Sequence, residues 1–200
     1  MMKILNRLFV IAALLTFAQA ALATIIIIDN EDDLLVNKTG AWTTSSNVSG
    51  FIGQNYEYDG NSGNGFSMDY LIANHSQFFV GLWTIEMSWT SHANRATNTP
   101  VFVQKSAGLG DYEEFSVNQT QPPNGGWFSL GDFMLDIGSM VSIDNRSDDT
   151  WFLYTDKTDG YVIADAFRFT SKSTSVSEPG ALALLGLGLV GLGFRRRMAR

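Results

Sequence analysis

The sequence predicts an all-β protein, an antiparallel β-sandwich with jelly-roll-like topology, with a hydrophobic helix at each end of the chain. Between these apolar ends, no long stretch shows the 3.6-residue apolar period of an amphipathic helix. Instead, short runs rich in β-branched and aromatic residues alternate with clusters of Gly, Asn, Asp and Pro. About ten strands with such frequent turns are typical of two sheets packed face to face.

The first 23 residues have the organisation of a secretory signal peptide. Lys3 and Arg7 form a basic region, residues 8–17 are apolar, and two Ala-x-Ala sites end at Ala20 and Ala23. A basic segment, a short apolar segment and such a site together define this kind of peptide. We therefore expect export of the chain and cleavage after Ala20 or Ala23.

The first strands of the domain are predicted from short apolar runs. Residues 24–29 form a nearly continuous apolar run, which predicts a strand buried on both faces. The clearest pattern follows at residues 79–89, where Trp83, Ile85 and Met87 alternate with polar residues and are expected to point inward. Three further strands are predicted between these two, at residues 41–44, 55–58 and 66–71.

The remaining strands follow from the same composition. Residues 121–126 read Gln-Pro-Pro-Asn-Gly-Gly, which predicts a turn between two of them. The strands are predicted at residues 100–105, 114–119, 127–134, 140–144, 151–154 and 161–169. The domain then covers residues 24–169, and a Ser/Thr-rich linker, 170–175, follows it. About 150 residues are enough for one hydrophobic core.

Charge and cysteine content exclude several classes of function. Residues 24–175 contain seven basic and 19 acidic residues, a net charge of −12. Such a surface repels nucleic acid and anionic membranes, so we expect no nucleic-acid partner. The chain has no cysteine, which rules out disulfides, thiolate metal sites and a cysteine nucleophile.

The last 25 residues, 176–200, form a second targeting signal. Glu178 and Pro179 precede an apolar run at 181–194 and a basic end. As a helix the run would be ~21 Å long, shorter than the ~30 Å hydrocarbon core of a bilayer. The arginines, expected to stay in the cytoplasm, are Arg195, Arg196, Arg197 and Arg200.

This layout resembles the PEP-CTERM sorting signal of Gram-negative bacteria. The resemblance implies an exosortase partner, an integral-membrane protease that recognises Pro-Glu-Pro and detaches the protein. It also implies an inner-membrane intermediate and a final place at the cell surface or outside the cell. Ser177 stands where the motif has its first Pro. An ordinary C-terminal membrane anchor is the alternative.

Six local motifs follow one another along the domain: Ile28–Asn30, Gly40–Ser45, Asn94–Pro100, Val117–Thr120, Trp127–Gly131 and Asp159–Phe169. In their order and spacing they resemble the golvesin-like domain, which also occurs as the carbohydrate-binding module of xanthan lyases. The resemblance covers residues 25–169. It implies a β-sandwich module usually attached to secreted enzymes, and it brings no catalytic residues.

Asp165 is the unusual residue of the last predicted strand. It shares its parity with Ile163 and Phe167, so its carboxylate should point inward, where it needs a cation or several donors. Two structural solutions are a pair with Arg95 and hydrogen bonds from the main chain. A third solution is a structural calcium ion at Asp29 and Asp165, with Asn30 as a further oxygen ligand, if the first and last strands pair. No other cofactor is expected.

The aromatic residues carry the argument for sugar binding. A flat ring can cover the apolar face of a pyranose while its polar tip stays hydrated. The candidate ligand contacts are Tyr56, Tyr58, Trp89 and Tyr112, with Trp42, Trp127 and Trp151 as further aromatic candidates, although most of the tryptophans are expected in the core. The loop 94–100 is expected to be structural, with direct sugar binding as the alternative.

Catalysis finds little support. His75 and His92 are the only histidines, and the sequence has neither a Gly-x-Ser-x-Gly nor a His-Glu-x-x-His motif. We therefore expect a non-enzymatic, exported cell-surface or extracellular-matrix protein that contacts polysaccharide. One alternative is a structural surface or biofilm scaffold that binds proteins or itself. The second is a polysaccharide hydrolase or lyase.

Overall fold

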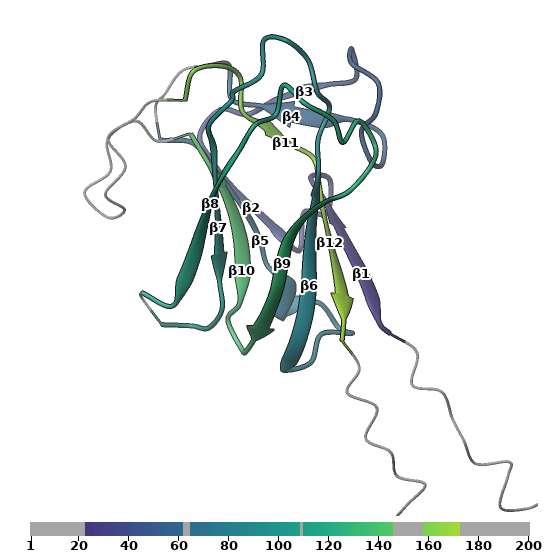
Figure 1. The fold of residues 1–200 in the computed structure, drawn as a ribbon, viewed down its shortest axis with the longest axis vertical. Coiled ribbons are helices and arrows are strands. Elements are labelled where there is room, and N and C mark those ends of the chain that lie inside the picture. The colour runs from purple at the N-terminus through teal and green to yellow at the C-terminus, as the bar shows by residue number, and fades with distance from the viewer. Residues whose placement is uncertain (1–22, 62–64, 109, 146–157, 173–200) are drawn as a thin grey trace, which may run out of the picture. The chain divides into compact units, whose positions relative to one another are not determined.

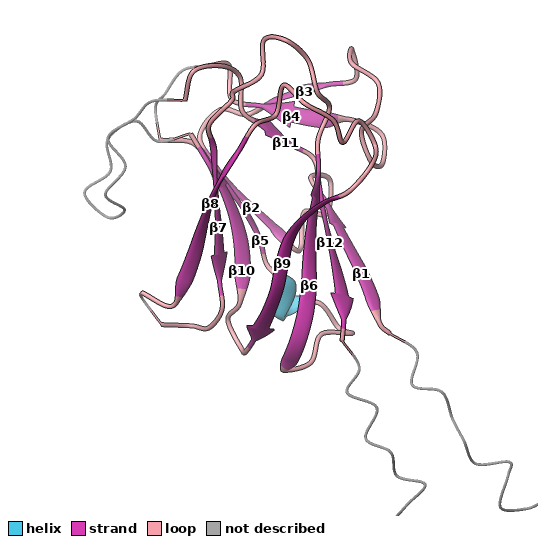
Figure 2. Ribbon diagram, viewed as in Figure 1, coloured by secondary structure: helices cyan, strands magenta, loops and turns pink. Residues whose placement is uncertain are grey.

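The computed structural model describes residues 23–61, 65–108, 110–145 and 158–172. They belong to one compact unit, Ala23–Lys172, in which all sheet pairings are antiparallel (Figures 1 and 2). The all-β prediction is confirmed. The predicted strand 151–154, the signal peptide (apart from Ala23) and the C-terminal sorting signal lie outside the described residues. Within the described part of the chain, no helix is long and apolar enough to cross a membrane.

Two larger sheets form the sandwich, and a smaller sheet lies at one end of it (Figure 1). The four-stranded sheet has the order β1 (Ile25–Asp29), β12 (Ala166–Ser171), β6 (Gly81–Ser88) and β9 (Phe128–Leu135). The five-stranded sheet has the order β2 (Val36–Thr39), β5 (Ser67–Tyr70), β10 (Met140–Asp144), β7 (Thr99–Gln104) and β8 (Tyr112–Val117). The third, which we call the end sheet, has the order β11 (Ile163–Ala164), β4 (Tyr56–Tyr58) and β3 (Thr43–Ser45). A short 3₁₀ helix, η1 (Ile72–Asn74), follows β5.

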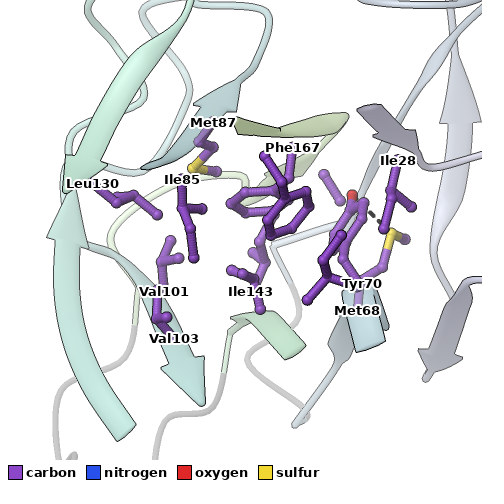
Figure 3. Packing of buried hydrophobic residues seen from close by; sticks show 14 of the residues in the cluster. Ile28, Met68, Tyr70, Ile85, Met87, Val101, Val103, Leu130, Ile143 and Phe167 are labelled. Atoms are coloured by element: carbon purple, nitrogen blue, oxygen red, sulfur yellow. Dashed lines mark hydrogen bonds between the residues drawn. The ribbon is translucent and has the colours of Figure 1, made fainter. Parts of the chain in front are cut away.

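The core lies between the two larger sheets, because alternate residues of their strands point inward. The predicted inward face of β6 is confirmed, since Trp83, Ile85 and Met87 are fully buried. Tyr70 and Phe167 from opposite sheets pack edge to face, with ring centroids 4.7 Å apart (Figure 3). Burying one such side chain contributes ~1.5–3 kcal/mol, so this layer holds the sheets together.

The observed strands differ from the predicted ones in three main respects. The strand 24–29 is not buried on both faces, because β1 is an edge strand whose Ile25 and Ile27 are 57% and 46% exposed. β2 is missing from the prediction, since only Val36 of its four residues is buried. The strand 161–169 is divided into β11 and β12 at Asp165, and β12 continues to Ser171, two residues into the predicted linker.

The first and last strands pair along their whole length, from Ile25 opposite Thr170 to Asp29 opposite Ala166. Pairing of the first and last strands was the condition for a site that joins Asp29 and Asp165, and this condition is therefore met. Asp165 directly precedes β12, so it lies beside the end of β1. The N–H of Asn30 donates to the main-chain oxygen of Asp165 at 2.8 Å.

Candidate functional site

The end sheet is held by buried polar side chains, and Arg95 is one of them. Its side chain is only 6% exposed. Its guanidinium donates to Thr90 O, to Asn94 Oδ1 and to the Tyr56 hydroxyl, each at 3.2 Å. Arg95 also lies over the Tyr56 ring, 5.3 Å from the centroid, as a cation–π contact. Arg95 therefore fastens the loop 89–98 to β4.

The predicted pair between Arg95 and Asp165 is wrong. The carboxylate of Asp165 instead accepts the N–H of Ile52, at 3.1 and 3.3 Å to its two oxygens. The prediction of a buried Asp165 is confirmed, because this residue is 0% exposed. Burial, and to a smaller extent the nearby negative charge of Asp29, raise the pKa of Asp165 to about 8, although the hydrogen bond from Ile52 acts to lower it. The main-chain solution left open by the sequence is the one observed.

Gln119 acts as a substitute for a neighbouring strand. Its Nε2 donates to Ile163 O and its Oε1 accepts from Ile163 N, both at 2.8 Å. Both main-chain groups of this β11 residue are therefore satisfied by one fully buried side chain. Sequence reasoning noted the motif around Gln119 but gave it no role; an amide side chain at the end of the predicted strand 114–119 was the available signal.

Gly160 allows the loop before β11 to touch the Arg95 loop. A Cβ at this position would lie 2.5 Å from Arg95 O. The close approach permits two main-chain bonds, from Ala96 N to Tyr161 O at 2.9 Å and from Tyr161 N to Asn94 O at 3.0 Å. The predicted structural role of the loop 94–100 is therefore supported by its contacts.

Two of the candidate sugar contacts are buried in the core and must be withdrawn. Tyr56 is 3% exposed because Arg95 covers it, and Trp89 is 1% exposed. The indole N–H of Trp89 donates to Gln121 O at 3.0 Å. Both rings therefore have structural roles, and neither is accessible to a sugar.

The other two candidates, Tyr58 and Tyr112, are half-buried. Tyr112, on β8, packs edge to face on Phe102, with centroids 6.0 Å apart. Tyr58, on β4, packs at 89° against Tyr161, with centroids 5.6 Å apart. Tyr161 is also half-buried, and sequence reasoning did not single it out. A tyrosine directly after the Asp-Gly turn at 159–160 was the signal that could have found it.

Polar groups flank the pair of Tyr58 and Tyr161. The main chain of Tyr161 is bonded to that of Asn94, an exposed residue. The Nδ1 atom of the exposed His92 lies 2.8 Å from Asn94 Oδ1. We call Tyr58, Tyr161, Asn94 and His92 the tyrosine site. It combines two aromatic rings with an amide and an imidazole at one end of the domain.

Trp127 is another half-buried aromatic residue, and it lies on the outer face of the four-stranded sheet. Arg168 lies over the Trp127 ring, 4.6 Å from its centroid, and its Nε donates to Glu86 Oε2 at 2.6 Å. The guanidinium thus covers one face of the indole. Trp127, one of the further aromatic candidates from the sequence, is thus partly exposed.

A row of four polar residues lies beside Asp165. Asn30 Nδ2 donates to Asn55 Oδ1 at 2.8 Å, and Asn55 Nδ2 donates to Glu31 Oε1 at 2.7 Å. The other terminal atom of the Asn30 amide is 2.7 Å from Asp29 Oδ1 and 3.1 Å from the Asn55 main-chain oxygen. Burial raises the pKa of Asp29 to about 6, and the charges of Glu31 and Asp32 contribute.

The histidines do not form a recognisable catalytic group. His75 Nδ1 accepts from Gln77 N at 3.1 Å, and the hydrogen-bonded side chain next to His92 is that of Asn94. In the described ranges, no group of three or more His, Cys, Asp or Glu side chains is placed to hold a metal ion.

Two family models match the chain. The Golvesin C-terminal domain matches residues 26–171, and the PEP-CTERM protein-sorting motif matches residues 175–197. Both resemblances predicted from the sequence are confirmed. The sorting residues Glu178, Pro179, Arg195, Arg196 and Arg197 lie in the second match and outside the described residues.

Xanthan lyases are similar to about three quarters of this chain. A xanthan lyase of Bacillus sp. (strain GL1) is 31% identical over 146 residues, which are 73% of this chain and 14% of the lyase. The structure of Paenibacillus xanthan lyase at 2.6 Å matches with a TM-score of 0.58 and 32% identity, over 74% of this chain and 13% of the lyase. The chain thus spans about a seventh of the relatives that it matches.

Proposed function

Because this chain belongs to the Golvesin C-terminal domain family and carries a PEP-CTERM sorting motif, we propose that it is an exported, non-enzymatic protein that binds polysaccharide at the tyrosine site. The sorting motif indicates export through the membrane to the cell surface or the extracellular space, with processing by an exosortase. The polysaccharide ligand and its site are the proposed part.

One observation carries the choice of site. Tyr58 and Tyr161 form a half-exposed, perpendicular ring pair beside an exposed amide and imidazole. A ring covers the apolar face of a pyranose, and Asn94 and His92 can exchange hydrogen bonds with its hydroxyl groups. The four residues come from β4 and two loops that are fastened to each other by Arg95 and Gly160, so the site is preorganised.

The net charge of the domain and its similarity to xanthan lyases restrict the class of ligand that we propose. The net charge of −12 between residues 24 and 175 favours a neutral polysaccharide over a polyanion. The relatives named above are xanthan lyases, and we take from them only the polysaccharide class of the ligand. Their catalytic activity is not carried over, because this chain matches only about a seventh of them.

The direct test is binding of the mature chain, residues 24–175, to the exopolysaccharide of its own source strain. Tyr161→Ala and Tyr58→Ala are each expected to weaken binding about 10-fold or more, equivalent to ~1.4 kcal/mol. Trp127→Ala is the matched control, since it removes another half-buried ring, one that packs against Arg168 of β12. Loss of binding in Trp127→Ala alone would move the site to the sheet face.

A scaffold function is the second candidate, and exposed apolar side chains favour it. Ile25 and Ile27 are 57% and 46% exposed on the edge strand β1, and Met134, at the opposite edge of the sheet on β9, is 62% exposed. An apolar edge strand such as β1 offers a surface for pairing with another chain. If the mature chain binds no glycan but self-associates, and Ile27→Asp abolishes that association, the scaffold function is correct.

Polysaccharide cleavage would contradict the proposal. The mature chain is expected to leave the same exopolysaccharide intact, as measured by reducing ends and by the absorbance of unsaturated products. Turnover that disappears in His92→Ala or His75→Ala would make the chain a hydrolase or lyase.

A further inference from the structure

Exposed apolar side chains gather at the end of the sandwich that lies opposite the end sheet. Phe79 and Val80 directly precede β6, and Met134 and Ile137 lie at and just beyond the end of β9. The first residues of β6 pair with the last residues of β9, so these two segments lie side by side. The exposed fractions are 45% for Phe79, 53% for Val80, 62% for Met134 and 74% for Ile137. We call these four side chains the apolar end.

The apolar end is carried by a backbone that is held in place. The indole N–H of Trp83 donates to Phe79 O at 3.0 Å, and the two ring centroids are 4.9 Å apart. The turn that carries Ile137 is closed by a hydrogen bond from Ser139 N to Asp136 O at 3.1 Å. Half of the large hydrophobic side chains that are exposed within the described residues belong to this end. Such a concentration marks a surface that contacts an apolar partner.

The charges beside the apolar end do not favour an anionic partner. Two lysines adjoin it, because their main chains are bonded to the start of β6 and to the turn after β9. Lys172 Nζ lies 3.4 Å from Asp132 Oδ2, and Lys105 Nζ lies 3.2 and 3.3 Å from the carboxylates of Asp111 and Glu113. Both lysines are therefore paired with acids. A partner that fits this surface is apolar and does not need a charge.

The course of the chain brings a lipid bilayer to this end. β12 ends at Ser171, and the N–H of Lys172 donates to Leu82 O at 2.8 Å, so the chain leaves the domain at the apolar end (Figure 1). The sorting motif matches residues 175–197, and its apolar run begins at residue 181. The residues between the domain and this run, 173–180, reach at most ~30 Å when fully extended. The apolar end therefore stays close to the membrane for as long as the run is inserted.

We propose that the apolar end contacts the lipid bilayer while the sorting segment is still in the membrane. Four side chains alone hold a bilayer weakly, but the short tether makes the contact intramolecular and so raises its effective concentration. Removal of the sorting segment removes the tether and releases the domain. In this orientation the length of β6 separates the end sheet from the bilayer. The contact does not depend on glycan binding, and its test uses no glycan.

The test uses the chain from residue 24 to residue 200 in phosphatidylcholine nanodiscs. Because the chain has no cysteine, a fluorophore can be attached at one position, Ile137→Cys or the control Thr44→Cys on the exposed side of β3. Brominated lipids should quench the fluorophore at position 137 and leave the one at position 44 unchanged. Since the contact is apolar, the quenching should persist at high salt and should not require anionic lipid.

Charged substitutions test the same surface. Val80→Asp should reduce the quenching at position 137 to the level at position 44, and Met134→Asp, on the other segment, should do the same. Thr43→Asp adds the same charge to the end sheet and should leave the quenching unchanged. Absence of quenching at position 137 in the chain without these changes would overturn the proposal. Shielding of that fluorophore from aqueous iodide without quenching by the lipids would also overturn it, because the sorting segment or a second copy would then cover the apolar end.

Discussion

The sandwich core and the end sheet are held together by opposite means. Between the larger sheets, apolar side chains such as Ile85, Tyr70 and Phe167 fill the space, and many of them share the work. In the end sheet, single polar side chains each satisfy particular main-chain groups: Gln119 for Ile163, and Asp165 for Ile52. Apolar packing is therefore redundant and polar support is specific, which makes the end sheet the easier part to reshape without unfolding the domain.

The largest effect is expected from the core. Phe167→Ala removes a fully buried ring that packs on Tyr70, and it should lower the free energy of unfolding by ~3–5 kcal/mol. Urea titration followed by tryptophan fluorescence measures it. Because the core joins both sheets, all regions should unfold in one transition; separate transitions for the two larger sheets would show that the core does not join them.

A smaller and local effect is expected from Gln119→Leu. The side chain keeps its volume, but Ile163 loses both hydrogen-bond partners, at a cost of ~1–3 kcal/mol. Hydrogen exchange should accelerate at residues 162–164 and stay slow in β6. Equal acceleration in both places would show that the end sheet is not a separate unit of stability. Gln121→Leu, an exposed neighbour, is the matched control.

Gly160→Ala should separate binding from stability. The added methyl group forces the Arg95 loop away from Tyr161, at a cost of ~1–3 kcal/mol. Glycan affinity should fall about 10-fold or more while the core stays folded. Gly60→Ala is the control, because a Cβ there meets no atom within 4 Å, although its positive φ adds some strain. Full affinity in Gly160→Ala would mean that the loop position does not matter for binding.

The smallest effect is expected at the surface of the end sheet. Hydrogen bonds from the Thr97 hydroxyl, and then from its main-chain N–H, lower the pKa of Asp159. The folded pKa lies below the unfolded value of ~3.9, so the stabilisation is present above that pH and disappears as the pH falls through the folded pKa. Asp159→Asn should therefore be slightly less stable than the wild type at neutral pH and equal to it in acid. A difference that grows in acid would contradict this.

The same contrast explains what the sequence could predict. Alternation over residues 79–89 is a local property, and it correctly predicted the inward face of β6. Parity also predicted that Asp165 is buried, but its donor, Ile52, is 113 positions away and no local pattern points to it. Likewise, Tyr56 and Tyr58 have the same parity, yet only Tyr56 is covered, because Arg95 from a distant loop lies on its ring.

The family resemblances were predictable for a different reason. The motif around Gly160 records a close contact between two loops, and the motif around Gln119 records a side chain that replaces a strand. These contacts require particular residue types, so they leave a recognisable sequence. The partners in each contact still came only from the structure.

If the proposed function is correct, the tyrosine site beside the end sheet, and not the face of the four-stranded sheet, contacts the polysaccharide. Two-dimensional amide NMR of the mature chain, titrated with oligosaccharides prepared from the exopolysaccharide of its own strain, locates the contact. Saturable shifts are expected at Tyr58, in the loop 92–95 and around Tyr161, with little change near Trp127 and Arg168. Saturable shifts confined to Trp127, Arg168 and their neighbours on β6 and β9 would contradict it.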